Sequence, residues 1–209
     1  MPRGVAIPEL HERLFAAAER LLLRDGPAGL SSRAITAEAA CAKGVLHNHF
    51  SDLDGFLLQF VLTRFRNALD GMAELPLRAG QDTVWHNLSA AAAALFQPPV
   101  LAAHAIVTHR PTLAARLRQS SGHHSPSLAD LEHLVVTYLD SEKRLRRLPP
   151  TVDTGPVALA LVATIHHLVM SARTHGVDPH ETFDRVVAAV VPAGPRRAAP
   201  SAQREGTAR

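Results

Sequence analysis

Apolar residues recur along most of the chain at the three- and four-residue spacing of amphipathic helices. The first such run places Leu10, Leu14, Ala18 and Leu21 on one helical face, and it ends at the Asp-Gly-Pro turn signal of residues 25–27. Alternation of apolar and polar residues between turn signals, the pattern of half-buried strands, does not occur. The pattern therefore predicts an all-α protein with nine or ten helices.

Capping and turn residues predict where these helices begin and end. We expect a second helix from Ser31 to Ala39, a third from Ala42 to Phe50, and a long fourth behind a capping box in which Ser51 is the cap. Asp82 is expected to cap a fifth helix, and further helices are expected from Pro98 to His109 and over 112–119. Ser125 before Pro126 is the expected start of the next helix. Asp153 or Thr154 is expected to cap a helix that ends at about Thr174, and the last helix runs from Asp178 to Val191.

Composition places the chain among globular proteins. Of 209 residues, 46% are hydrophobic and 20% are charged, which suffices for a real hydrophobic core. The net charge of +3 lies in the tail 192–209, and the rest of the chain is balanced, so the charge is weak evidence for a nucleic-acid partner. The single cysteine, Cys41, excludes a disulfide within the chain.

Neither a targeting segment nor a membrane span is predicted. The N-terminus has no apolar signal-peptide region and becomes charged within nine residues. The longest apolar stretch, residues 157–170, is broken by polar residues and is shorter than the roughly 20 residues that a span needs. We expect a soluble, cytoplasmic protein with no membrane partner.

Residues 10–57 have the layout of a helix-turn-helix, with three short helices and a tight turn between the second and third. In the third helix, Val45, Leu46 and Phe50 can pack on the first two helices. The positions between them are small, basic or hydrogen-bonding, as a helix that enters a DNA groove requires: Lys43, Gly44, His47, Asn48 and His49.

Residues 14–57 resemble the N-terminal DNA-binding region of TetR-family transcriptional regulators. The matching positions are Ala17-Ala18, Gly26, Ile35, Ala39, Lys43-Gly44, Leu46, His49-Phe50 and Leu57. The resemblance implies that Ser31, Ser32 and Arg33 hold backbone phosphate. It also implies that Lys43, Gly44, Val45, His47, Asn48 and His49 face the major groove of double-stranded operator DNA.

The chain departs from this family pattern at several positions. Ala40 replaces the usual turn glycine and would be strained if its φ is positive. Cys41, Ala42, His47 and Leu53 replace a valine, a serine, a tyrosine and a lysine, which removes a hydroxyl and a phosphate contact. Residues 1–57 also hold six basic against seven acidic side chains, a poor balance for binding DNA.

The helix over residues 157–174 is apolar nearly all round, which favours a subunit interface over a core helix of a monomer. TetR-like proteins dimerise in this way. We expect a homodimer whose interface includes Leu134, Tyr138, Leu161, Ile165 and Leu168. The resemblance further implies a pocket for a small, apolar effector among the later helices, with Trp85, Phe96, His104, His109 and Tyr138 as candidate lining residues.

Thirteen histidines raise the alternative of a helical metal- or haem-binding protein, but none has the spacing of a metal site. No catalytic motif occurs either, so no enzymatic activity, cofactor or metal is expected. The sequence predicts a DNA-binding domain over 1–52, a ligand-binding and dimerisation domain over 53–191, and a disordered tail over 192–209. The predicted function is a transcriptional repressor that an effector releases; a sensing module without DNA binding remains an alternative.

Overall fold

The computed structural model describes residues 7–119, 127–171 and 178–192, and these residues form helices and turns without any strand. The all-α prediction is confirmed. The ten α-helices of the described residues are α1 (Ile7–Asp25), α2 (Ser32–Glu38), α3 (Val45–His49), α4 (Leu53–Ala73), α5 (Val84–Ala92), α6 (Pro98–His109), α7 (Pro111–Gln119), α8 (Leu128–Arg144), α9 (Thr154–Ser171) and α10 (Pro179–Val190). Three short 3₁₀ helices accompany them: η1 (Pro27–Gly29), η2 (Leu75–Arg78) and η3 (Ala93–Phe96).

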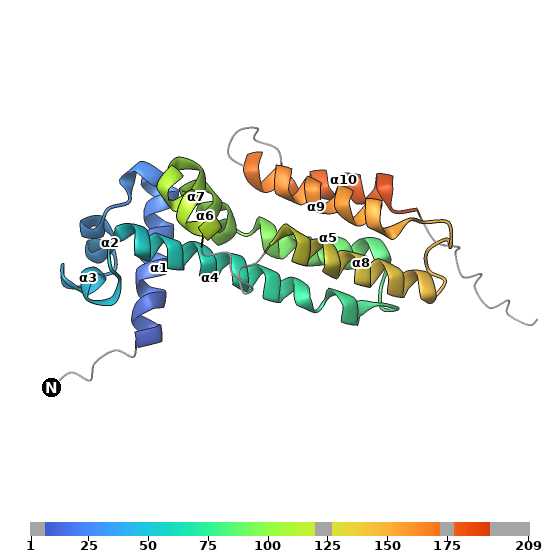
Figure 1. Ribbon diagram of the computed structural model, residues 1–209, viewed down its shortest axis with the longest axis horizontal. Coiled ribbons are helices and arrows are strands. Elements are labelled where there is room, and N and C mark those ends of the chain that lie inside the picture. The colour runs from blue at the N-terminus through green and yellow to red at the C-terminus, as the bar shows by residue number, and fades with distance from the viewer. Residues whose placement is uncertain (1–6, 120–126, 172–177, 193–209) are drawn as a thin grey trace, which may run out of the picture.

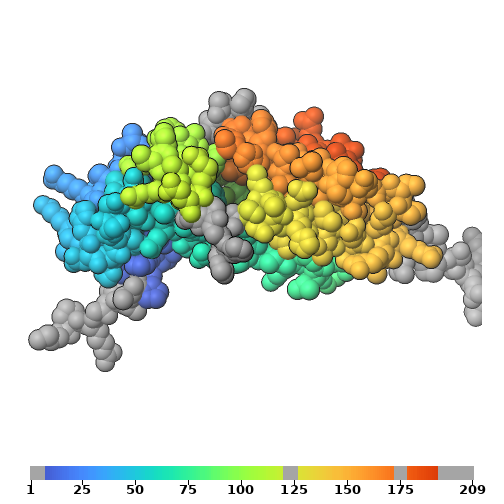
Figure 2. Space-filling model, in the orientation of Figure 1, coloured from blue at the N-terminus to red at the C-terminus, as the bar shows by residue number. Residues whose placement is uncertain are grey.

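The molecule is elongated, and α4 runs along much of its length (Figure 1). Helices α1 to α3 gather at one end, around the start of α4. Helices α5, α8, α9 and α10 form a bundle at the other end, and α6 and α7 lie over the region between the two groups. The space-filling view shows the same order along the long axis (Figure 2). The helix-turn-helix therefore lies at the far end of the molecule from the α8–α10 bundle.

Two hydrophobic clusters stabilise these two halves. The N-terminal cluster joins residues of α1 to α4 with Ala103 and Ile106 of α6 and Leu113 of α7. The other cluster fills the bundle of α4, α5 and α8 to α10. Phe65 of α4 packs against both clusters. Helices α1 to α3 are thus packed against the rest of the chain and are not tethered to it by a free linker.

Two of the predicted helix caps are wrong by one residue. Asp52, not Ser51, caps α4, because its backbone is extended and its Oδ1 accepts the amide of Gly55 at 2.6 Å. Thr83, not Asp82, caps α5. Asp82 has a positive φ of 40° and belongs to the preceding turn, where its Oδ1 accepts the Thr83 amide.

The start of α8 also differs from the prediction, whereas that of α10 agrees with it. Ser127 forms a capping box with Asp130, so α8 begins at Leu128, two residues beyond the start that we expected. Asp178 caps α10 as predicted. The expected cap at Ser125, the loop before it, the end of the apolar helix at Thr174 and most of the tail lie outside the described residues.

Helix α9 meets the length and composition of a membrane span, which the sequence argument did not expect. Its 18 residues, Thr154–Ser171, would by length and composition alone suffice to cross a membrane, as would the pair Val84–Phe96 and Pro98–His109, which is bent by 53°. One third of α9 is buried within the chain, and it packs on α6, α8 and α10. These contacts are those of a core helix with one uncovered face.

Candidate nucleic-acid interface

The second helix of the motif presents its first turn to solvent. Ser31 is extended, with a φ of −142°, and its Oγ accepts the amide of Ala34 at 3.1 Å, so Ser31 is the N-cap of α2. Ser32 is half-buried and Arg33 is exposed. Of the three residues that the resemblance assigns to phosphate, Arg33 therefore has the freest side chain.

The turn between α2 and α3 contains the strained backbone that the sequence suggested. Ala40 has a φ of +50°, a conformation that glycine adopts freely and alanine does not. The next residue, Cys41, is half-buried against the N-terminal core, and its amide donates to the carbonyl of Thr36 at 2.8 Å. Arg13 of α1 donates to the carbonyl of Ala39 at 3.0 Å. These contacts hold the turn in place despite the alanine.

The third helix divides into a buried and an exposed face, as predicted. Leu46 and the following Phe50 are buried in the N-terminal core, and Val45 is half-buried. Of the six residues that the sequence assigned to the groove, five are exposed (Lys43, Gly44, His47, Asn48 and His49), whereas Val45 is half-buried. Helix α3 spans five residues, and Gly44, its N-cap, makes no side-chain capping bond. Packing on α2 and α4, and not intrinsic propensity, therefore keeps α3 helical.

A histidine of α1, which the sequence analysis missed, supports the end of α3. The His11 ring lies edge-on to His49 at 5.7 Å between centroids and 4.7 Å from Phe50. Its Nε2 is buried and has no hydrogen-bond partner within the described part of the chain. Burial, and to a smaller extent the nearby His49, lower the pKa of His11 from its ordinary 6.5, so the neutral ring is favoured.

The basic residues of this region fall into two groups. Arg20 and Arg24 of α1 pair with Glu38 of α2 at 2.7 and 3.1 Å, and these contacts fix the angle between the two helices. The side chains of Arg33 and Lys43 make neither an ion pair nor a hydrogen bond with any residue that the structure describes. The two unpaired cations lie at the start of α2 and just before α3, on the face that the resemblance assigns to DNA.

The motif is joined to the rest of the chain at the corner between α6 and α7. Arg110 donates to Oδ1 of Asp54 in α4 at 3.1 Å and to the carbonyl of Leu30 at 3.3 Å. Thr112 donates to the other oxygen of Asp54 at 3.3 Å. Arg116 lies 3.4 Å from Asp52, the cap of α4. The corner therefore contacts the chain before α2 and the first turn of α4 together.

None of the five residues predicted to line an effector pocket lines either of the two hollows described below. Trp85 is 42% exposed, and its Nε1 donates to the carbonyl of Asp184 on α10. Phe96 of η3 is buried against Phe183, which also belongs to α10.

The other three predicted residues lie in separate environments. His104 is half-buried, and burial, followed by the charge of His166, lowers its pKa. His109 is exposed and hydrogen-bonds to its own helix. Tyr138 is fully buried; its hydroxyl accepts from Asn87 at 3.1 Å, and burial raises its pKa. Phe96 and Tyr138 belong to one core cluster, and the effector-pocket list as a whole stays a prediction.

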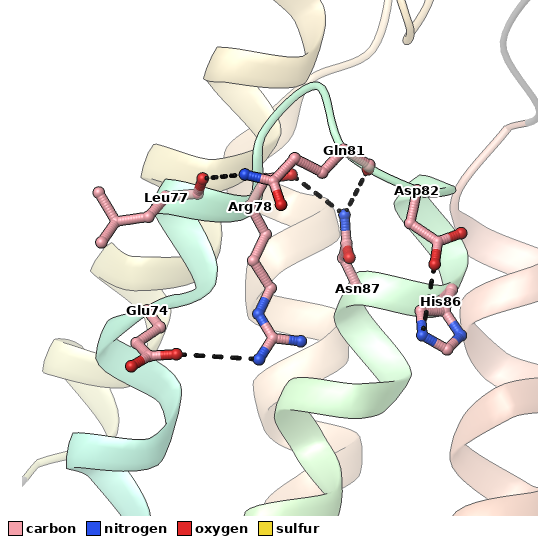
Figure 3. A pocket seen from close by; sticks show the side chains of 7 residues that line it. All are labelled: Glu74, Leu77, Arg78, Gln81, Asp82, His86 and Asn87. Atoms are coloured by element: carbon pink, nitrogen blue, oxygen red, sulfur yellow. Dashed lines mark hydrogen bonds and ion pairs between the residues drawn. The ribbon is translucent and has the colours of Figure 1, made fainter.

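A groove of about 410 Å³ lies between the end of α4 and the start of α5 (Figure 3). The polar groups that line it pair with one another. Asn87 donates to the carbonyls of Arg78 and Gln81, Arg78 approaches Glu74 at 3.9 Å, and His86 approaches Asp82 at 3.5 Å. These contacts close a turn of the chain, which accounts for the polar groups without a ligand.

The predicted interface residues face the interior of a single chain. Tyr138, Leu161, Ile165 and Leu168 are buried in the core of the bundle, and Leu134 packs against that core from a half-buried position. They are therefore occupied within one protomer, which corrects the list. The face of α9 left uncovered contains Leu159, Ala163, His167 and Met170, at helical spacing. Periodicity could not separate the two faces, because both are apolar.

The histidines do not gather into a metal site in the part of the chain that the structure describes. No group of three or more histidine, cysteine, aspartate or glutamate side chains with metal-binding geometry occurs there. His104 and His166 approach each other across α6 and α9, but two imidazoles leave a metal ion short of protein ligands.

The geometry of α1 to α4 defines a helix-turn-helix of the DNA-binding kind. Residues 14–59 match the family model described as bacterial regulatory proteins, tetR family. The resemblance seen in the sequence is confirmed, and the chain has the DNA-binding domain and the fold of TetR-family transcriptional regulators. No curated protein sequence matches the chain.

Solved structures agree with this fold over most of the chain. A protein from Mesorhizobium loti assigned to the TetR family is 15% identical, with a TM-score of 0.63 over 90% of this chain and 95% of its own. Escherichia coli NemR in its reduced form is 15% identical, with a TM-score of 0.65 over 90% and 99%. The multidrug binding protein EbrR, complexed with imidazole, is 19% identical, with a TM-score of 0.57 over 91% and 99%.

Proposed function

We propose that the protein is a dimeric transcriptional regulator that binds operator DNA through α2 and α3. The observation that carries this proposal is the pair of unpaired cations, Arg33 and Lys43, on the exposed face of a helix-turn-helix whose other basic side chains are held in intramolecular contacts. Salt-dependent affinity for DNA needs cations that are free to replace counterions. The near-neutral charge of the region therefore understates its capacity to bind phosphate.

Each exposed side chain of the motif has a role in this proposal. Arg33 and Ser32 hold backbone phosphate, and Ser31 keeps the start of α2 in place. Lys43 and Asn48 donate to base edges in the major groove, and Val45 contacts a thymine methyl group. His47 and Gly44 lie beside them on the exposed side. His49 is positioned by its edge contact with His11, and it fits a phosphate contact better than base reading.

Dimerisation is assigned to the uncovered face of α9. This helix contains no Asp, Glu, Lys or Arg, and it exposes Leu159 by 56% and Met170 by 48%. Exposed apolar residues in a continuous stripe are typical of a protein interface. A second copy packed on this stripe by two-fold symmetry would present two recognition helices to successive major grooves.

We further propose that a small, apolar effector releases the protein from its operator. The relative EbrR is complexed with imidazole, which supports a ligand-binding role for the corresponding helices here. The corner at Arg110 offers a route by which a shift of α6 reaches α2 and α4. In this proposal the protein is cytoplasmic and has no enzymatic activity, and repression is its output.

The decisive experiment is binding of the purified protein to its own upstream intergenic DNA, compared with a random duplex, at two salt concentrations. Specific binding that weakens as salt rises supports the regulator. Equal binding to both duplexes, or none to either, contradicts regulation of its own gene and favours a sensing module; metal and haem analysis of untagged protein then tests the remaining alternative.

A further inference from the structure

A cleft of about 340 Å³ opens where α1, α4 and the corner of η3 and α6 meet, away from the groove of Figure 3. This volume lies at the lower end of the range for small-molecule sites. Its walls are mostly apolar and include Ala68, Ala94 and Val100. Three charged side chains, Glu12, Glu19 and Arg64, line the same cleft.

The charged group has an excess of negative charge. The guanidinium of Arg64, which is 8% exposed, donates to Glu19 at 2.6 Å and to Glu12 at 2.8 Å. It also lies 5.4 Å from the ring centroids of Phe15 and Phe60. Two carboxylates around one guanidinium leave a local charge of −1. The carboxylate side chains remain partly open, at 61% for Glu12 and 21% for Glu19.

We propose that this cleft is a binding site for a small organic cation with an apolar body. The ammonium group would donate hydrogen bonds to Glu12 and Glu19 and neutralise the excess negative charge. The apolar body would lie against Ala94 and Val100. An organic anion does not fit, because each of the three guanidinium nitrogens of Arg64 already donates to Glu12 or Glu19 and a third carboxylate would meet two others.

The position of the cleft makes its occupation consequential. Glu12 and Glu19 belong to α1, which is part of the DNA-binding end, whereas Ala94 belongs to η3 and Val100 to α6. A bound cation therefore contacts both α1 of the DNA-binding end and the segment where η3 joins α6. Binding at this cleft is measurable without DNA, so its outcome does not depend on the proposed function.

Calorimetry of the full chain with benzylammonium tests the site, with benzyl alcohol and benzoate as probes of similar shape and different charge. We expect one benzylammonium per chain, benzyl alcohol roughly tenfold weaker or worse, and no benzoate binding. The proposal is overturned if benzyl alcohol or benzoate binds with the same affinity as benzylammonium. It is also overturned if benzylammonium does not bind in the millimolar range.

Three variants locate the site. Glu19→Gln removes the negative excess and should weaken benzylammonium by roughly tenfold. Ala94→Phe fills the cleft but leaves the three charged residues intact, and it should abolish benzylammonium binding. It tests the site independently of Glu19→Gln, in case that variant fails to fold. Glu9→Gln, an exposed acid on the same helix outside the cleft, is the matched control and should bind as the wild type does. Unchanged affinity in a folded Ala94→Phe protein rules the cleft out.

Discussion

Arg110 and Asp54 form an ion pair of 3.1 Å between the residue that follows α6 and the first turn of α4. The same guanidinium donates to the carbonyl of Leu30, directly before α2. Because one side chain contacts the chain at both helices, a displacement of the corner between α6 and α7 cannot leave the DNA-binding end unaffected. The pair therefore links the corner between α6 and α7 to the DNA-binding end of the molecule.

Replacing Arg110 should therefore cost more than replacing a neighbouring arginine. Arg110→Ala removes the contacts with Asp54 and with the Leu30 carbonyl; the side chains of Arg110 and Asp54 are each 27% exposed. We expect a loss of about 1 kcal/mol in the free energy of unfolding. Arg116→Ala is the matched control: its pair with Asp52 is about half exposed, and we expect a change within roughly 0.5 kcal/mol. Urea denaturation measures both. Equal losses would show that Arg110 is an ordinary surface residue.

The strained turn between α2 and α3 predicts a substitution that raises the free energy of unfolding. Ala40→Gly should raise the free energy of unfolding by roughly 1 kcal/mol, because glycine adopts the φ of +50° at no steric cost. The control is the same substitution at Ala37, an exposed position inside α2, where glycine should lower stability by about 1 kcal/mol. Denaturant midpoints compare the two. A destabilising Ala40→Gly would show that the turn is not strained.

The positions of the helices and of the strained turn could be predicted from the sequence, because each depends on few neighbouring residues. Helical periodicity located the helices, and the family pattern located Ala40 and the exposed residues of α3. The contacts of His11 with His49 and of Arg110 with Leu30 join residues far apart in the sequence, and no local signal marks them. The inward face of α9 was missed for another reason: both of its faces are apolar, so only the packing of α8 and α10 decides which one is buried.

Acidic conditions should loosen the DNA-binding end. The pKa of His11 is lowered by burial, so the unfolded chain binds a proton more readily than the folded chain, and stability falls as pH drops through 6.5 towards the lowered pKa. His11→Phe keeps an aromatic ring beside Phe50 and removes this proton. The variant should lose fewer degrees of melting temperature than the wild type between pH 7.5 and pH 5.5 (values that bracket the ordinary pKa of about 6.5).

The control for that titration is His133→Gln, an exposed histidine on α8. It should follow the wild-type curve, including the contribution of the same sign from His104. Identical pH profiles for the wild type and His11→Phe would contradict the role given to His11.

The uncovered face of α9 predicts which substitutions separate the subunits. Leu159→Arg places a charge in the proposed interface on both copies, and we expect the dimer to weaken by roughly 100-fold or more. Leu77→Arg, at a position that is 76% exposed in η2, is the control and should leave assembly unchanged. Sedimentation velocity over a dilution series measures both. A Leu159→Arg protein that remains dimeric would place the interface elsewhere.

Lys43 should contribute to DNA affinity through salt-dependent contacts. Lys43→Ala should weaken operator binding and reduce the slope of log affinity against log salt by about 1 for each half-site. Arg144→Ala, an exposed cation at the end of α8, removes the same charge far from the motif and should change neither quantity. Fluorescence anisotropy at several salt concentrations gives the slopes. An unchanged slope in Lys43→Ala would place this lysine outside the interface.

The charge-free face of α9 has a consequence for how the protein would respond to its own abundance. If each copy must cover that face with another before two recognition helices can bind together, operator occupancy at low abundance rises with the square of the chain concentration. Halving synthesis would then reduce occupancy about fourfold in that regime, since dimer concentration follows mass action. A small change in expression of this gene would thus act as a steep control on the genes it regulates.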